Sequence, residues 1–254
     1  CGKSEQEITD ELAGAIFRNP VTQQWETSDE YLSGNVREKL ATAEKFAENH
    51  AEYQINVDYL KRVQPKDLDA SEIEVRLGAN WVKPEYITQF MKEVFKTPNY
   101  YVGSDIKATY SEISGAWNIS GKSLDRGNPL ITNTYGTLRV NAYKLLEDAL
   151  NLRDTKIYDT IHDADGDHRV LNKQETMLAQ QAQESIREAF KQWIFKDLDR
   201  REDLCATYNR IFNAIRPREY DGSHIRFEGM TPEISLMPHQ KNAVAHILYG
   251  NNTL

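Results

Sequence analysis

The sequence contains little cysteine, glycine or proline and no long hydrophobic run, and each shortage excludes a class of protein. Its two cysteines, Cys1 and Cys205, are too few for a disulfide framework, so we expect a reducing, cytoplasmic setting. The 13 glycines and 8 prolines among 254 residues are too few for a fibrous or disordered chain. No apolar run approaches the roughly 18 residues that a membrane span requires, so we expect no membrane partner.

The sequence also lacks any run of five or more lysines and arginines, which would be a strong signature of nucleic-acid binding. The net charge is -8, and most of it comes from the first sixty residues, which contain 5 basic and 12 acidic residues. The rest of the chain is close to neutral, with 12 basic against 11 acidic residues over 61–150 and 14 against 16 over 151–254. Charge therefore neither excludes nor indicates contact with DNA.

Hydrophobic spacing predicts an α+β fold that is mostly helical. Residues 5–64 carry apolar side chains at helical spacing, beginning with Ile8, Leu12 and Ile16. Pro84 occupies the position of a first helical residue and opens a further helix. The remaining helices are expected over 142–152, as a long pair between 173 and 217, and from Pro238 to Gly250.

Alternating polar and apolar residues predict two β-hairpins in the middle of the chain, which form a small antiparallel sheet. One hairpin turns at Ser114-Gly115, and the other turns at 163–167. The segment 73–77 alternates like a strand but precedes Gly78 as a helix would, so both alternatives stay open. The pattern divides the chain into an acidic helical region at 1–66 and a mixed α/β module at 67–217, which ends in the helical pair.

Short motifs for phosphate and metal binding are incomplete. The segment 121–123 (Gly-Lys-Ser) matches the end of a phosphate loop, but Ala116 stands where the first glycine is needed and no apolar helix follows. The segment 163–167 alternates carboxylates as a calcium loop does, but the sixth position is His168 and the twelfth is Gln174. We therefore expect a hairpin tip at 163–167 and no metal site.

Motifs for nucleophilic and acid–base catalysis are also incomplete. The segment 221–224 (Asp-Gly-Ser-His) holds the residue types of a triad in consecutive positions, which favours a turn over a catalytic arrangement. The neighbouring carboxylates Glu147 and Asp148 point in different directions on a helix, so we expect them on solvated faces. We expect most of the tryptophans in the core and no catalytic residue.

Several longer segments resemble one known family. They are EYLSGNVREKL (30–40), VQPKDLDASEIEVRLGANWV (63–82), TYGTLRVNAYKLLEDALNLRD (134–154), VLNKQET (170–176) and the whole stretch from Asn209 to the end. They are similar to the region that precedes the ATPase core in very large proteins of conjugative elements and phages. These proteins join an adenine-specific DNA methyltransferase to a Snf-type helicase. The resemblance covers nearly the whole chain and implies that 218–254 is a linker and the start of the helicase core.

Within this resemblance, the segment from Leu236 to Gln240, followed by an apolar helix, is similar to the glutamine motif, in which the side-chain amide reads the adenine of ATP. Gln240 is therefore the nucleotide-binding residue that the resemblance implies, although Met237 stands where the family has arginine. The phosphate loop of the helicase and the catalytic motif of the methylase do not occur in these residues, so we expect a fragment without catalysis or a cofactor of its own. ATP and Mg²⁺ are expected for the parent helicase, and S-adenosylmethionine for the parent methylase.

We interpret the chain as a non-catalytic accessory module that positions DNA or couples the flanking methylase and helicase domains of the same protein. The candidates for DNA contact are Arg210, Arg216, Arg218 and Arg226, four positive charges close together in the sequence. The alternative is that nearby carboxylates balance these arginines and that the chain is a protein–protein scaffold without nucleic-acid contact. The acidic first sixty residues favour this alternative.

Overall fold

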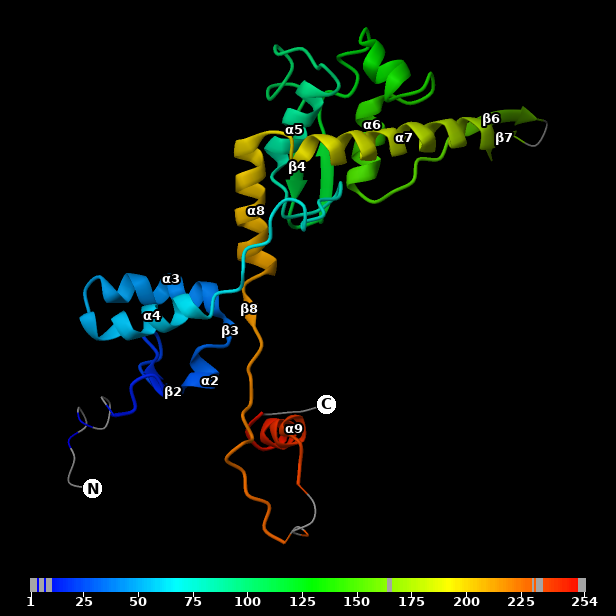
Figure 1. Cartoon of the computed structure of the whole chain (residues 1–254). Coiled ribbons are helices and arrows are strands. Elements are labelled where there is room, and N and C mark those ends of the chain that lie inside the picture. Colours follow the sequence, from blue (N-terminus) through cyan, green and yellow to red (C-terminus); the bar gives the residue numbers. More distant parts are fainter. Residues whose placement is uncertain are drawn as a thin grey trace. The chain divides into compact units, whose positions relative to one another are not determined.

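The computed structural model describes residues 4, 7, 11–163, 166–229, 231 and 235–250. Ile8, where the first helix is expected, and the hairpin-tip positions 164 and 165 lie outside the described residues. The chain divides into two compact units: one consists of Leu68–Tyr208, and the other combines Cys1–Asp67 with Asn209–Leu254. We call them the middle unit and the terminal unit and describe each by itself (Figure 1). The first and last parts of the sequence thus fold together, and the middle unit is inserted between them.

The terminal unit combines short strands with helices from both ends of the sequence. Its elements are β1 (Ile16–Arg18), β2 (Trp25–Thr27), α2 (Ser28–Tyr31), β3 (Gly34–Asn35), α3 (Val36–Ala47), the 3₁₀ turn η1 (Ala51–Tyr53), α4 (Gln54–Arg62), β8 (Ile215–Arg216) and α9 (Pro238–Tyr249). Strand β1 pairs with β2, and β3 pairs with β8, both antiparallel. Helices α3 and α4 lie side by side (Figure 1). The β3–β8 pair joins the two ends of the sequence.

The helix expected through Ile16 is wrong, because this residue starts strand β1. The next residue, Phe17, is fully buried, and its ring stacks on Tyr31 with 5.2 Å between the ring centroids. The side-chain amide of Asn56 in α4 donates to the carbonyl oxygen of Arg18 and to the Tyr31 hydroxyl, each at 2.9 Å. These contacts with distant residues override the local helical spacing.

The middle unit contains the predicted hairpins and the predicted helical pair. Its elements are α5 (Pro84–Glu93), β4 (Ala108–Ser111), β5 (Ala116–Ile119), the π-helical turn η2 (Leu130–Thr134), α6 (Ala142–Leu150), β6 (Tyr158–Asp163), β7 (Gly166–Leu171), α7 (Lys173–Ile194) and α8 (Leu198–Phe212), whose last residues belong to the terminal unit. The mostly helical α+β prediction is therefore confirmed. Each hairpin forms a two-stranded sheet of its own within the described ranges. Of the helices that are described, none is long and apolar enough to cross a membrane.

Helix α5 packs through an aromatic centre. Its Phe90 is fully buried, and its ring meets Phe95, Phe190 and Trp193 edge-to-face, with centroid distances of 5.3, 5.4 and 5.3 Å. Because Phe190 and Trp193 belong to α7, this centre holds α5 against α7. Trp193 and Trp117 are buried, as predicted for most of the tryptophans, whereas Trp81 is partly buried and Trp25 is 45% exposed.

The undecided segment 73–77 is neither a helix nor a strand. Its alternating residues Ile73, Val75 and Leu77 are buried in the core of the middle unit. The next residue, Gly78, has a φ of +92°, and a Cβ atom there would lie 2.6 Å from a backbone carbonyl oxygen at the end of α6. The alternation therefore reflects the burial of every second side chain. The segment ends at Gly78 because no other residue fits this φ and this close carbonyl oxygen.

Candidate functional sites

Gln240 lies in the first turn of α9, and its side chain is exposed. Its amide oxygen Oε1 accepts a hydrogen bond from the backbone N–H of Met237 at 2.9 Å, so this side chain closes the N-terminus of the helix. Its amide nitrogen Nε2 has no hydrogen-bond partner in the described part of the chain. If Gln240 binds adenine, it can offer this donor and also the second lone pair of Oε1, since the bond from Met237 uses only one.

The segment 221–224 forms a turn, as predicted, and it supports α9. The carboxylate of Asp221 accepts hydrogen bonds from the backbone N–H and the hydroxyl of Ser223, at 2.9 and 2.8 Å. Gly222 approaches the helix so closely that a Cβ atom would lie 2.0 Å from a backbone carbonyl oxygen of α9. The ring of Tyr220 stacks on His246 at 4.5 Å. These residues therefore hold a helix in place, which is a structural role.

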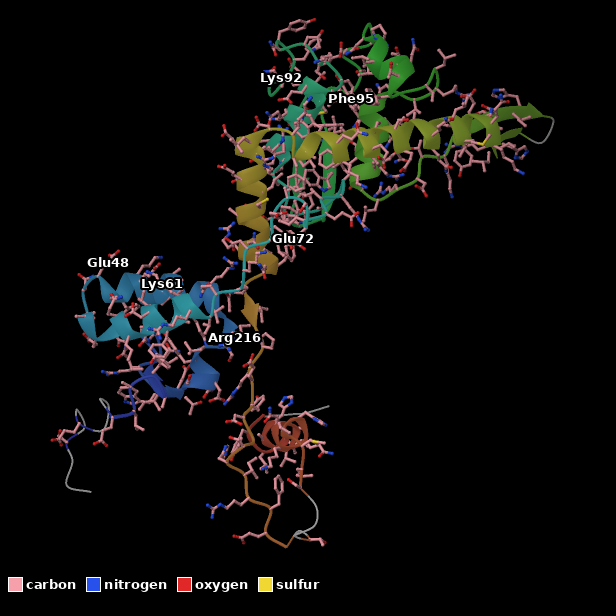
Figure 2. All side chains as sticks on the ribbon, in the orientation of Figure 1. Glu48, Lys61, Glu72, Lys92, Phe95 and Arg216 are labelled. Carbon is pink, nitrogen blue, oxygen red and sulfur yellow. The ribbon has the colours of Figure 1, made fainter. Side chains whose placement is uncertain are left out.

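Two of the four candidate DNA-binding residues are engaged within the terminal unit. Arg216, labelled in Figure 2, donates to the carbonyl oxygen of Leu32 at 3.1 Å and forms an ion pair with Glu219 at 3.5 Å. Arg218 binds the carboxylate of Asp29 through Nε at 2.8 Å and Nη2 at 2.7 Å. These bonds connect β8 and the segment after it to α2 and the residue that follows α2. They also neutralise much of the positive charge that would otherwise attract a DNA phosphate.

Arg210 and Arg226, the other two candidates, are exposed. Arg210 lies in the last turn of α8, and Arg226 follows the turn at 223–224. Neither guanidinium forms an ion pair or a hydrogen bond with any residue that the structure describes. The structure thus brings Arg216 and Arg218 together beside α2 and leaves the charges of Arg210 and Arg226 uncompensated.

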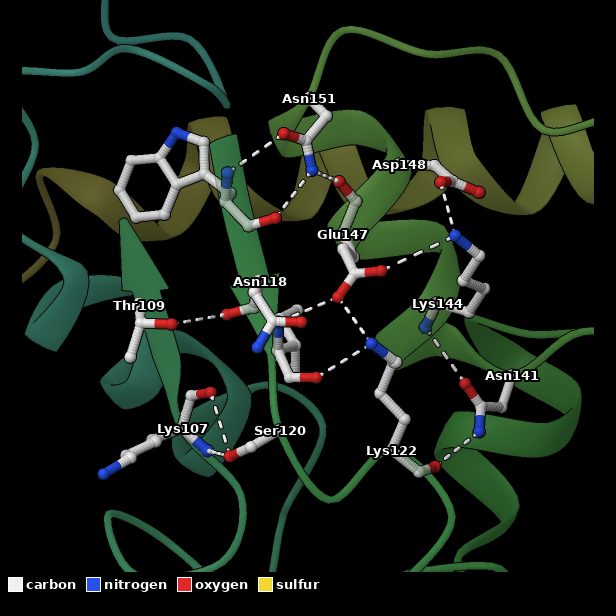
Figure 3. A network of polar contacts seen from close by, with 12 residues as sticks. Lys107, Thr109, Asn118, Ser120, Lys122, Asn141, Lys144, Glu147, Asp148 and Asn151 are labelled. Carbon is white, nitrogen blue, oxygen red and sulfur yellow. Dashed lines mark hydrogen bonds and ion pairs between the residues drawn. The ribbon is translucent and has the colours of Figure 1, made fainter. Parts of the chain in front are cut away.

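Lys122 of the Gly-Lys-Ser segment belongs to a polar network between β5 and α6 (Figure 3). Its ammonium donates to the carbonyl oxygen of Ile119 at 2.9 Å and forms an ion pair with Glu147. The same carboxylate accepts the backbone N–H of Ile119 at 2.8 Å and pairs with Lys144 at 3.5 Å. The lysine therefore fastens the end of β5 and the segment after it to α6, and this segment is not arranged as a phosphate loop.

The expectation that Glu147 and Asp148 are solvated is wrong, because their side chains are only 13% and 11% exposed. Asp148 forms an ion pair with Lys144 at 2.8 Å and accepts the hydroxyl of Thr155 at 3.0 Å. Burial raises the pKa of Glu147, but the hydrogen bond from Ile119 and the two lysines outweigh it and hold this pKa below its ordinary value. The sequence could not reveal this burial, because the partners come from β5 and the loop that follows it.

We expect Glu147→Gln to lower the free energy of unfolding at pH 7 by about 1–2 kcal/mol, because Lys122 loses its charged partner. The melting temperature should fall by about 2–4 °C for each kcal/mol. A carboxyl whose pKa is lowered in the folded state stabilises above its unfolded pKa of about 4.3 and loses this contribution as the pH falls. The difference between Glu147→Gln and the native chain should therefore shrink in thermal melts as the pH falls from 7 toward 3.

The exposed Glu112→Gln change is the control, since its side chain lies in the β4–β5 turn away from this network. It should leave the melting temperature nearly unchanged at both pH values. A loss for Glu147→Gln that persists undiminished in acid would contradict the assigned role of the carboxylate.

The β6–β7 hairpin confirms the predicted tip at 163–167, since its register runs from Tyr158 opposite Leu171 to Asp163 opposite Gly166. Figure 1 shows it beyond the N-terminal end of α7. The calcium-loop alternative falls partly on positions 164 and 165, outside the described residues. In the described ranges, no group of three His, Cys, Asp or Glu side chains lies close enough together to hold a metal ion.

A cavity of about 600 Å³ lies in the middle unit where α5 and α7 end and α8 begins. Its walls include Glu93, Lys96, Trp193, Lys196 and Arg200. Both lysines are exposed, and neither ammonium has an ion-pair or hydrogen-bond partner among the described residues. The sequence analysis missed this site, because its residues are separated by about a hundred positions and match no spacing motif.

These features define an α+β protein in which a helical unit with two hairpins is inserted into a smaller unit built from both ends of the sequence. Residues 76–214, more than half of the chain, match the family described as a domain of unknown function, DUF8437, and the chain belongs to this family. Residues 1–26 match the family described as a probable helicase, winged helix domain, which indicates a helicase context. No curated protein and no solved structure matches the sequence.

Proposed function

We propose that this chain is a non-catalytic accessory region of a DNA helicase and that it positions DNA. The observation that carries the proposal is the match of residues 1–26 to a helicase winged-helix domain, because winged-helix and related domains place a helix in a DNA groove and their flanking residues on the backbone. The matched residues belong to the terminal unit, which also carries the uncompensated charges of Arg210 and Arg226. Phosphate contact through these side chains is the simplest use of such charges.

The finer part of the proposal concerns the parent protein. The resemblance of several long segments supports a Snf-type helicase joined to an adenine-specific DNA methylase, carried by a conjugative element or phage and located in the cytoplasm. ATP and Mg²⁺ would serve that helicase, and S-adenosylmethionine would serve that methylase. Within this chain, Gln240 can offer adenine its amide nitrogen and the second lone pair of its oxygen, while the first accepts the backbone N–H of Met237.

The second candidate function is a protein–protein scaffold that couples the flanking methylase and helicase domains. The β6–β7 hairpin favours it, because Ile161 and Val170 are 48% and 46% exposed and the strands carry more acidic than basic residues. Exposed apolar side chains on a protruding element are typical of protein contacts, and acidic ones disfavour DNA. Salt dependence separates the two functions, because phosphate contacts weaken steeply with added salt and apolar contacts do not.

Fluorescence anisotropy of labelled single- and double-stranded DNA tests the proposal on the whole chain. We expect binding that weakens between about 50 and 200 mM salt, and Arg210→Gln/Arg226→Gln should weaken it about tenfold and lower the logarithmic salt slope by about 2. Arg126→Gln/Arg153→Gln removes two exposed charges of the middle unit and serves as the matched control. An absence of binding at low salt would leave the scaffold as the working function.

A further inference from the structure

The cavity between the ends of α5 and α7 collects three cationic side chains from three different elements. Lys96 follows α5, Lys196 follows α7, and Arg200 lies in the first turn of α8. The acidic residues at the same cavity are Glu93 and Asp197. Three positive and two negative charges leave the lining with a net positive charge.

Both acidic residues already accept hydrogen bonds from N–H groups of the protein. Glu93 accepts the side-chain amide of Gln89 at 2.8 Å and the indole N–H of Trp193 at 2.6 Å, one on each oxygen. Asp197 accepts the backbone N–H of Arg200 at 2.9 Å and so caps α8. These bonds fix the two carboxylates in structural roles, whereas the two lysines keep uncompensated charges.

Arg200 supplies the fixed positive charge of the cavity. Its residue is only 3% exposed, and its guanidinium lies 3.6 Å from the ring centroid of Trp193. Nε donates to the carbonyl oxygen of Ile194 at 2.8 Å and Nη2 to that of Trp193 at 2.9 Å, which offsets the negative end of α7. The third nitrogen, Nη1, is buried without a hydrogen-bond partner. Because this atom has no accessible surface, Arg200 acts on an anion in the cavity through its charge and not through a direct hydrogen bond.

Lys96 adds an independent observation, because its φ is +55°. A side chain disfavours this left-handed backbone conformation, and glycine is the residue that adopts it freely. A lysine therefore stands at the cavity where the backbone alone would favour glycine. Strained conformations of this kind concentrate at binding sites, where the side chain contributes more than the strain costs.

We propose that this cavity is a binding site for a phosphate group, held by the ammonium groups of Lys96 and Lys196 and attracted by the positive charge of the buried Arg200. A phosphate presents several oxygens in different directions, which suits two ammonium groups that line the same cavity from different segments of the chain. The group belongs either to a nucleic-acid backbone or to a free nucleotide or diphosphate. The site does not depend on the DNA-positioning function, since a free phosphate compound satisfies the same donors.

The test compares Lys96→Gln/Lys196→Gln with Lys107→Gln/Lys156→Gln in the whole chain. The control removes the same charge from two exposed lysines of the same unit. The probes are labelled single-stranded DNA, labelled duplex DNA, ATP and inorganic pyrophosphate, followed by anisotropy or calorimetry. We expect the cavity variant to weaken binding of at least one probe about tenfold and, for DNA, to lower the logarithmic salt slope by about 2. The control variant should stay within about twofold of the native chain.

Lys96→Gly separates binding from folding, because glycine relieves the left-handed backbone and removes the ammonium. We expect this variant to keep or raise the melting temperature while it weakens the same probe. If no probe binds the native chain, or if the control loses as much affinity as the cavity variant, the proposed site is wrong. If every probe that binds the native chain binds the cavity variant equally well, the site is wrong as well, and the DNA-positioning function would still stand on Arg210 and Arg226.

Discussion

Phe90→Ala is expected to lower the free energy of unfolding of the middle unit by about 3–5 kcal/mol, the usual range for truncating a fully buried phenylalanine. The ring of Phe90 contacts three further aromatic rings, those of Phe95, Phe190 and Trp193. Its removal leaves a cavity among side chains that are themselves buried and cannot turn to water. It also frees α5 from α7, so the ends of both helices at the proposed phosphate site should lose their fixed positions.

Urea denaturation followed by intrinsic fluorescence measures this loss, because Trp193 is part of the cluster. The matched control is Tyr100→Ala, which removes an aromatic side chain that is 71% exposed. The control should change stability by less than about 1 kcal/mol, since most of its ring faces water and its aromatic contact is with the neighbouring Tyr101. Equal losses for the two variants would show that the aromatic cluster is not the centre of this unit.

The elements that could be predicted are those with a strong local signal. Pro84 fits the first turn of a helix because it needs no N–H partner there, and the following apolar residues lie on one buried face. Ser114 and Gly115 mark a hairpin because Gly115 adopts a left-handed φ of +61° between two alternating strands. Such signals act within a few residues, so tertiary contacts rarely overturn them.

The elements that could not be predicted depend on distant partners. Ile16 shares helical spacing with its neighbours, yet the pairing of β1 with β2 and the burial of Phe17 against Tyr31 decide its conformation. Glu147 stands next to a second carboxylate, Asp148, in the sequence, yet β5 and Lys122 cover it. Patterns of one strand or helix contain no information on which element will lie against it.

The candidate sites also divide into those that could be predicted from the sequence and those that could not. The glutamine of the α9 segment could be placed in the first turn of a helix, because Pro238 precedes it. The cavity could not be predicted, because the conformation of Lys96 and the burial of Arg200 appear only in three dimensions. Charge clustering in sequence pointed to Arg216 and Arg218, whose partners in α2 come from the opposite end of the chain.

Arg37→Ala is expected to loosen the terminal unit at the point where its chain segments meet. The guanidinium of Arg37, in the first turn of α3, donates to the carbonyl oxygens of Asn213 at 2.8 Å and Pro65 at 3.2 Å. It also pairs with the carboxylate of Asp67. Its side chain is 23% exposed, so these bonds are partly shielded from water. Because hydrogen bonds of charged groups contribute about 1.5–3 kcal/mol each and are not additive, we expect a loss of about 2–3 kcal/mol.

Hydrogen exchange locates this loss, since the backbone N–H of Val36 donates to the carbonyl oxygen of Ala214 at 3.1 Å next to the β3–β8 pair. This amide should exchange faster in Arg37→Ala, whereas amides of α6 in the middle unit should keep their rates. Arg37→Lys retains the charge but lacks the planar fork that reaches several acceptors. The Val36 amide should therefore exchange in Arg37→Lys at a rate between those of the native chain and Arg37→Ala. Lys45→Ala, an exposed change on the same helix, should have no effect on this amide. An unchanged rate in Arg37→Ala would show that Arg37 is not needed to hold the two ends of the sequence together.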